Sequence, residues 1–139
     1  MSSELKSPLA DWPRDLAKEL TEARFNGAVG HELVSETQRV RVWSIRLKPG
    51  ERIGFHRHVL DYFWTAITDG RSVSHYGDGR IAEKTYAAGD TQHYSFGPGE
   101  FMVHDLHNIG DTELAFTTVE FLGSANTPLP IPDRLRRRN

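Results

Sequence analysis

Hydrophobic and polar residues alternate along most of this chain with the period of two that is typical of β-strands. The alternation begins near His31 and is clear at residues 38–47, where Trp43, Ile45 and Leu47 fall on one face. Turns rich in glycine and proline interrupt it repeatedly. They separate further expected strands at residues 50–70, 71–76, 80–86, 91–96, 100–111 and 113–122. Many short strands with evenly spaced turns predict a single all-β domain, either a sandwich or a small barrel.

One helical pattern precedes these strands, at residues 11–25. Its apolar stripe recurs at helical spacing and consists of Trp12, Leu16, Leu20 and Ala23. Asp11 or Trp12 can cap the helix, and Pro13 suits its first turn. We expect this helix to pack on the outside of a sheet. Residues 1–10 are polar, and we expect them to be disordered at the start.

Composition supports one globular domain with three parts. The chain has 139 residues, of which 37% are hydrophobic and 26% charged, as in an ordinary soluble domain. We expect an N-terminal extension with a short helix at 1–37, a β-barrel at 38–122 and a tail rich in proline and arginine at 123–139. The four arginines of the tail predict a solvated, frayed terminus, and a polyanion-binding role is less favoured. They are Arg134, Arg136, Arg137 and Arg138.

Charge and cysteine content exclude several classes of function. The net charge of −2 gives no indication of nucleic-acid or membrane binding. The absence of cysteine excludes disulfides, thiolate metal sites and cysteine nucleophiles, and it fits a reducing compartment. The sequence shows neither a signal peptide nor a long apolar run, so we expect a cytoplasmic protein.

Three histidines carry the strongest chemical signal. His56 and His58 stand two residues apart in an expected strand, so both imidazoles project from the same face. His104 lies on a separate expected strand. Strands so far apart in the sequence converge only if the sheet curls, as it does in a small barrel, whose interior holds ligands. Three imidazoles that converge in this way would make a metal site.

The placement of these residues resembles the cupin superfamily of small double-stranded β-helix barrels. The first cupin motif is matched by Gly50, His56 and His58, and the second by His104, Asn108 and Gly110. Pro98 and Gly99 resemble the turn before the last histidine, with slightly altered spacing. The resemblance covers residues 38–122. It implies an all-β fold, a cupin-like double-stranded β-helix with a short N-terminal helix, and a metal held by His56, His58 and His104.

The chain departs from the cupin pattern where a glutamate usually completes the metal site. Tyr62 and Phe63 occupy that place, and neither replaces a carboxylate. In a continuous strand, Tyr62 shares the face of the histidines and Asp61 points away, so Asp61 ligates only if the strand bulges. We therefore expect a three-histidine site, in which Tyr62 hydrogen-bonds a bound water or a substrate oxygen. Cupin-type dioxygenases include three-histidine iron sites, so the resemblance keeps that chemistry open.

Several other residues are candidates for the pocket. Tyr62, Trp64 and Met102 share the parity of the ligands and are expected pocket walls. His93 is a candidate fourth ligand or general base, beside Tyr62 as a candidate catalytic group. We expect His75 to be a surface or hydrogen-bonded histidine and His107 to lie outside.

These observations favour a metal-dependent enzyme that acts on a small molecule. We expect one divalent ion, Fe, Zn, Ni or Mn, and a carboxylate or dicarbonyl substrate handled by oxygenase-like or by lyase- or isomerase-like chemistry. The alternatives are a non-catalytic metabolite-binding cupin and a metal-free structural dimer. Among cupins, the phrase HRHVLDYFW is most similar to small proteins connected with β-alanine degradation. The outward parity of Phe63 and Ile67 favours a homodimer, with no nucleic-acid or membrane partner.

Overall fold

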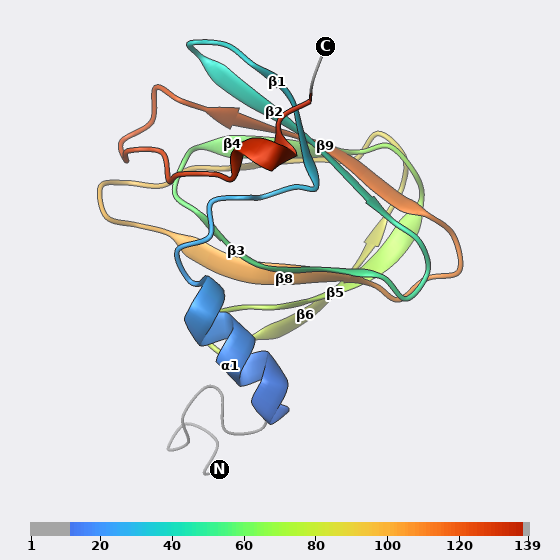
Figure 1. Cartoon of the computed structure of the whole chain (residues 1–139). Helices are drawn as coiled ribbons and strands as arrows, with labels where there is room; N and C mark the ends of the chain where they lie inside the picture. The colour runs from blue at the N-terminus through green and yellow to red at the C-terminus, as the bar shows by residue number, and fades with distance from the viewer. Residues whose placement is uncertain (1–11, 138–139) are drawn as a thin grey trace.

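The computed structural model describes residues 12–137, which form two antiparallel sheets that face each other (Figure 1). One short helix lies outside them. The helical elements are α1 (Arg14–Ala23) and the 3₁₀ turn η2 (Asp133–Leu135). The strands are β1 (Glu32–Glu36), β2 (Val40–Leu47), β3 (Arg52–His58), β4 (Tyr62–Ala66), β5 (Gly70–His75), β6 (Ile81–Tyr86), β7 (Thr91–Tyr94), β8 (Met102–Asn108) and β9 (Leu114–Phe121).

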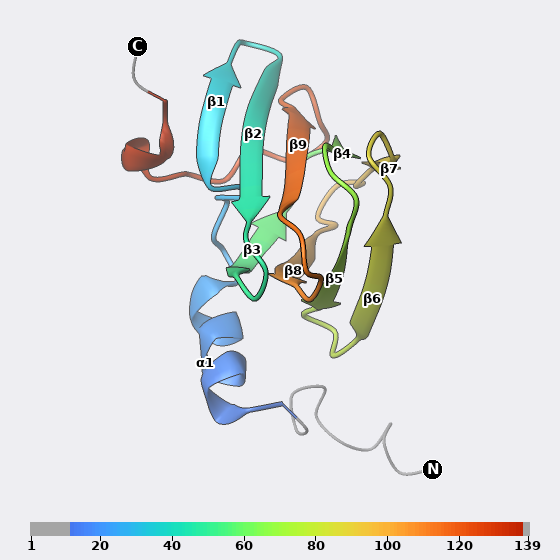
Figure 2. The same ribbon diagram turned by 90° about the vertical axis from the view of Figure 1, so that its right-hand side faces the viewer.

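The first sheet has the strand order β1-β2-β9-β4-β7, and the second has the order β3-β8-β5-β6. Figure 2 shows the first sheet from β1 across to β4, with the C-terminal segment beside β1. Neighbours such as β2 and β9 are distant in sequence, as in a double-stranded β-helix. The expected all-β class and the single short N-terminal helix are confirmed. The first strand, β1, lies before residue 38 and adds an edge to the first sheet.

The core between the two sheets is built from the inward-facing members of the alternating pattern. The face predicted for β2 is buried, because Trp43, Ile45 and Leu47 are each at most 5% exposed. The main cluster draws on both sheets and consists of Ile45, Leu47, Ile53, Ala66, Tyr86, Leu106, Leu114 and Phe116, with Trp64 packed against it. This cluster fills one end of the space between the sheets.

Helix α1 packs on the outer face of the second sheet, as its apolar stripe predicts. Trp12 stacks on Phe55 of β3 with 5.9 Å between ring centroids, and Leu20 is buried beside Val103 of β8. The N-cap is Pro13, without a side-chain hydrogen bond; Asp11, the other predicted cap, lies outside the described residues. No helix in the range 12–137 is long and apolar enough to cross a membrane.

A partly buried ionic network, centred on the buried Asp105, ties α1 to the sheet. Arg52 of β3 donates through Nε to Asp105 of β8 at 2.7 Å, and its two terminal nitrogens donate to Glu19 of the helix at 2.8 and 2.9 Å. Asp105 is fully buried and also accepts the backbone N–H of His75 at 2.6 Å. The network therefore links α1, β3, β8 and β5.

The expected strand at 50–70 is two strands in different sheets. β3 ends at His58, residues 59–61 cross from the second sheet to the first, and β4 begins at Tyr62. The crossing has no glycine or proline to mark it in the sequence. Leu60, which is 1% exposed, turns inward at the corner and keeps the apolar pattern unbroken. The prediction of one continuous strand from His56 through Leu60 to Trp64 is therefore wrong.

The C-terminal tail is docked rather than frayed as far as residue 137. Arg136 forms an ion pair with Glu36, and Arg137 pairs with Glu32 at 2.6 Å and donates its backbone N–H to Leu33 at 2.9 Å. Both glutamates belong to β1, so the tail follows that edge strand. The prediction of a solvated terminus overlooked these carboxylates. Arg134 is exposed, and Arg138 lies outside the described residues.

Candidate metal centre

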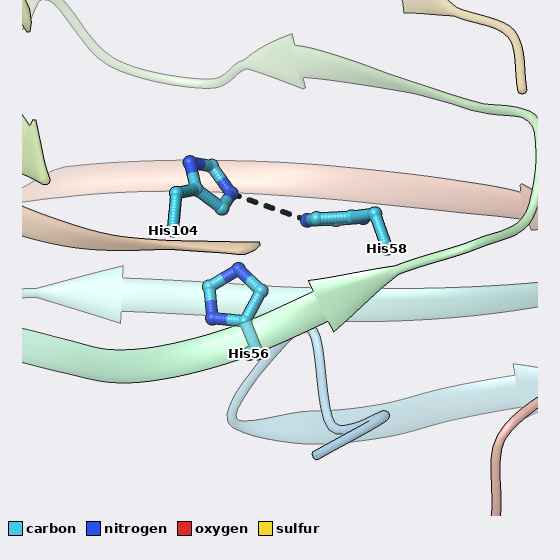
Figure 3. A group of neighbouring side chains, drawn as sticks. All are labelled: His56, His58 and His104. Carbon is cyan, nitrogen blue, oxygen red and sulfur yellow. Dashed lines mark hydrogen bonds between the residues drawn. The ribbon is translucent and has the colours of Figure 1, made fainter. Parts of the chain in front are cut away.

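The three predicted ligands meet between the two sheets. His56 and His58 project inward from β3, and His104 projects inward from β8, where it lies directly opposite His56 in the antiparallel ladder. Figure 3 shows the three rings directed toward one another. Because ladder partners stand side by side, two neighbouring strands alone bring the three imidazoles together. No closure of the barrel between distant strands is needed.

The distances between the rings suit a shared cation. Nε2 of His58 and Nε2 of His104 are 3.2 Å apart (Figure 3), and one ligand atom from each histidine lies within 4.8 Å of the others. Nitrogen ligands bind zinc at about 2.0–2.1 Å, so two ligands at a tetrahedral or octahedral angle stand roughly 2.8–3.4 Å apart. His58 and His104 already have this separation.

All three imidazoles are held in the neutral form that binds metals. Burial lowers the pKa of His56 to about 4, against a smaller opposing effect of the Gly54 carbonyl. The pKa values of His58 and His104 lie well below the usual value, first because of burial and then because of repulsion among the histidines. Neutral rings keep a lone pair for coordination at ordinary pH.

The tautomer of His56 is fixed by the backbone. Its Nδ1 lies 2.9 Å from the carbonyl oxygen of Gly54. A carbonyl can only accept, so Nδ1 carries the proton and the lone pair is on Nε2. This is the arrangement by which a backbone group commonly orients a ligating histidine. The Nδ1 atoms of His58 and His104 are buried without a partner in residues 12–137. For these two rings, a cation at Nε2 would set the tautomer.

Within residues 12–137, no carboxylate joins the three histidines in a metal-binding group. Asp61 lies on the crossing between β3 and β4, and its Oδ1 accepts the backbone N–H of Phe96 at 2.9 Å. The β3–β8 ladder is irregular between Ile53 and His56 rather than near Asp61. The donor set that fits a metal is therefore three neutral imidazoles, and a divalent ion held there would keep its full positive charge.

Tyr62 stands beside the histidines without being in the metal-binding group. Its ring stacks on His58 with 4.1 Å between centroids and on Tyr94 with 4.8 Å. Burial, followed by the neighbouring Tyr94, raises the pKa of Tyr62 well above its usual value. The phenol is therefore a protonated donor. The predicted inward direction of Tyr62 is met, although it reaches the site from the opposite sheet.

A cavity of about 310 Å³ adjoins the histidines. Tyr62 and Trp64, two of the predicted walls, line it. So do the other tyrosines, Tyr76, Tyr86 and Tyr94, which means that all four tyrosines of the chain face this space. Sequence reasoning missed the last three because no ligand on their strands showed which face was inward. The signal in the sequence was that all three are tyrosines, like Tyr62.

Other predicted residues lie elsewhere. His93 is on the exposed side of β7 and contacts Phe63 at 5.2 Å between ring centroids, while its neighbours Gln92 and Tyr94 face the cavity. Met102 lines a separate outer hollow. His75 is hydrogen-bonded to Asp105 on the outside of the barrel. The structure thus does not bring His93 or Met102 to the cavity.

Comparison with known proteins agrees with this fold. No protein-family model and no curated protein matches the chain. Among solved structures, a cupin domain from Bordetella pertussis is 28% identical, covering 63% of this chain and 85% of that one, with a TM-score of 0.55. A conserved protein with a double-stranded β-helix domain from Klebsiella pneumoniae is 29% identical, covering 66% and 75%, with a TM-score of 0.52.

A third structure shows the same fold at lower identity. It is an RmlC-like cupin family protein with a double-stranded β-helix fold from Methanocaldococcus jannaschii, 21% identical over 63% of this chain and 73% of that one, with a TM-score of 0.50. The topology and these similarities show that the chain has the small double-stranded β-helix fold of the cupin superfamily. Between its two sheets lies the cluster of His56, His58 and His104. The resemblance to cupins of β-alanine degradation receives no support from these structures.

Proposed function

We propose that this chain is a metal-dependent enzyme acting on a small anionic or dicarbonyl substrate. The observation that carries the proposal is the cluster of His56, His58 and His104, three neutral imidazoles at metal-binding separation beside a cavity of about 310 Å³. These residues would hold one divalent ion, Fe, Zn, Ni or Mn. When bound, such an ion supplies Lewis-acid polarisation of a substrate oxygen, or a redox centre if it is iron.

The absence of a carboxylate in the ligand set favours an anionic substrate. The positive charge of an ion held by three neutral ligands would be uncompensated, and it would attract a carboxylate or enolate oxygen. The cavity can also donate hydrogen bonds to such a group. Burial raises the pKa of Tyr86 to about 12 and that of Tyr76 above its usual value, so their hydroxyls stay protonated. Together with Tyr62, they would donate hydrogen bonds to substrate oxygens in the cavity.

The rim of the cavity adds one positive charge. Lys84 donates to the Gln92 side chain at 2.7 Å, and its ammonium group lies 5.3 Å from the Trp64 ring centroid. Glu83, the neighbouring carboxylate of the lining, is paired with Arg71 at 2.6 Å. Lys84 is therefore available to orient the second anionic group of a dicarboxylate or keto acid. Tyr62 would orient His58 by stacking and hydrogen-bond the substrate.

Metal content is the first test. We expect about one ion per chain after loading with Fe(II), Zn(II), Ni(II) or Mn(II) and removal of free metal, measured by elemental analysis. His56→Ala, His58→Ala and His104→Ala should each lose most of it. His93→Ala is the matched control, because that histidine lies on the exposed side of β7, and it should retain the metal. Equal metal content in His104→Ala and the original chain would refute the site.

Turnover is the second test. Protein loaded with Fe(II) under nitrogen is exposed to oxygen with 1,3-dicarbonyls, keto acids and short amino acids, and oxygen uptake and product masses are followed. The other three metals are tested for lyase or isomerase products. Turnover that disappears in His104→Ala but persists in His93→Ala supports the proposal. A loaded protein that binds these compounds and releases them unchanged with all four metals would instead show a metabolite-binding cupin.

A further inference from the structure

A second hollow of about 560 Å³ lies on the outer face of the second sheet, on the same side as α1. Its walls come from the end of α1, from β3, from the start of β8 and from the turn between β5 and β6. Arg57 of β3 reaches it because this residue has the opposite parity to the ligands His56 and His58. The hollow is thus separate from the metal cavity, although Tyr76 borders both.

Two arginines and two phenylalanines form a stack along one wall. The guanidinium carbon of Arg57 lies 3.7 Å from the ring centroid of Phe101 and 4.8 Å from that of Phe25. The guanidinium carbon of Arg24 lies 5.1 Å from the Phe25 centroid. Phe25 and Phe101 are 58% and 52% exposed. Flat cationic and aromatic groups are therefore held in contact with each other at the open surface.

The positive charge of this stack is not balanced. In the described part of the chain, neither Arg24 nor Arg57 forms a salt bridge, and Nε of Arg57 is buried without a hydrogen-bond partner. Burial lowers the pKa of Arg57, and the nearby Arg24 lowers it further. The third arginine, Arg80, already pairs with Asp78 at 2.9 Å. Because neither Arg24 nor Arg57 has a carboxylate partner within residues 12–137, an anion in the hollow could accept hydrogen bonds from their terminal guanidinium nitrogens.

We propose that the hollow binds a small organic anion. Its carboxylate or phosphate group would contact Arg24 and Arg57, and its apolar body would cover Phe25 and Phe101. Guanidinium groups bind such anions through two parallel hydrogen bonds, and stacking on Phe101 keeps Arg57 in a fixed plane. The exposed rings offer an apolar surface that would otherwise remain in contact with water. The site is independent of the proposed enzyme activity.

Calorimetric titration with phenyl phosphate, benzoate and inorganic phosphate tests this site. We expect phenyl phosphate to bind the full chain, and the double variant Arg24→Gln/Arg57→Gln to bind it about tenfold more weakly or worse. The control Arg39→Gln changes an exposed arginine outside the hollow and should bind normally. His104→Ala should also bind normally, which separates this site from the metal cavity.

Two further measurements distinguish the parts of the proposal. Phe101→Leu should weaken phenyl phosphate more than inorganic phosphate, because only the former has an apolar ring to stack. Arg24→Gln alone guards against misfolding of the double variant, and thermal unfolding verifies both. Unchanged binding in the double variant, or binding lost in His104→Ala, would overturn the proposal. So would failure of all three probes, or self-association in sedimentation that the double variant abolishes, since the hollow would then hold another copy of the chain.

Discussion

Tyr62 stacks on His58 and occupies the place where the cupin motif has a carboxylate. Its ring contacts His58 on the second sheet and Tyr94 on the first, with 4.1 and 4.8 Å between centroids. His58 lacks a backbone acceptor for Nδ1, unlike His56. Stacking on Tyr62 therefore restrains the plane of the His58 ring together with the contact between His58 and His104, and we infer that Tyr62 is primarily a positioning residue.

The two functions of Tyr62, stacking and hydrogen bonding, can be separated by substitution. Tyr62→Phe keeps the ring, so metal content should be unchanged and the free energy of unfolding should fall by less than about 1.5 kcal/mol. Tyr62→Ala removes a buried ring and should cost roughly 3–5 kcal/mol, with weaker metal retention. Urea unfolding and elemental analysis measure both effects. Metal retained equally by both variants would show that the stack does not position His58.

Glu120 of β9 is a buried carboxyl group outside the three-histidine group. It is 2% exposed and accepts the indole N–H of Trp43 at 2.7 Å. Burial raises its pKa from 4.5 to about 7, although Trp43 and Arg41 favour the ionised form. A carboxyl whose folded pKa is raised stabilises the fold below the pKa of the unfolded chain. That stability is lost as the pH rises through the folded value.

Glu120→Gln should therefore remove a pH dependence. Relative to this variant, the original chain should lose up to roughly 3 kcal/mol of unfolding free energy between pH 4.5 and pH 7, with little further change above. Glutamine keeps an oxygen for the Trp43 N–H, so the variant should still fold. Denaturant unfolding at pH 5, 6, 7 and 8 gives the difference curve. A difference that does not vary with pH would contradict the buried, protonated form of Glu120.

At the scale of elements, β3 serves two faces. Its inward residues include two of the candidate metal ligands, and its outward Arg52 links α1 to Asp105 of β8. The inward set determines the site, and the outward set holds the helix against the sheet. Because both sets belong to one strand, the position of α1 and the orientation of the ligands depend on the same backbone.

Loss of the Asp105 carboxylate should loosen this attachment. Asp105→Asn keeps the shape but removes the buried charge that Arg52 and the His75 backbone contact, so the free energy of unfolding should fall by about 2–3 kcal/mol. Glu113→Gln is the control, because its pair with Arg46 is 43% and 60% exposed and should contribute less than about 1 kcal/mol. Urea unfolding measures both. Equal losses would show that burial of the network is unimportant.

The alternating pattern predicted most of the strands and the candidate ligands, whereas it did not predict the corner after His58 or the docking of the C-terminal tail. Alternation located the strands because each has one face toward the core, as in Trp43, Ile45 and Leu47. The spacing of His56 and His58 predicted a shared face, since both lie on β3. The corner after His58 was missed because Leu60 is buried and continues the apolar pattern. The docking of Arg136 and Arg137 was missed because β1 supplies the partner glutamates from the opposite end of the sequence.

For the whole molecule, the candidate centre lies between two sheets, and most connections between successive strands cross from one sheet to the other. The ligands come from the second sheet, and Tyr62 and Tyr94 come from the first. A cation bound there would stabilise only the folded chain, because the three histidines converge only after folding. Several residues of the main core cluster also line the cavity. Metal loading should therefore stabilise the whole fold rather than a single loop.

Metal loading should raise the unfolding temperature by several degrees. At a free metal concentration about 100 times the Kd, binding adds about 2.7 kcal/mol to the free energy of unfolding. The shift should be reversed by a chelator and should be absent in His104→Ala. Calorimetry at fixed protein concentration with each of the four metals measures it. A shift of equal size in His104→Ala would place the metal elsewhere on the chain.

The gathering of every tyrosine around one cavity has an optical consequence. The near-ultraviolet absorption of tyrosine in this protein comes entirely from the walls of the candidate site, and Trp64 emits from the same space. Trp12 lies on the outer face of the second sheet, and Trp43 donates its indole N–H to Glu120. A ligand in the cavity would thus change the near-ultraviolet absorption and the tryptophan fluorescence of the unlabelled chain, so its binding could be followed without an added label.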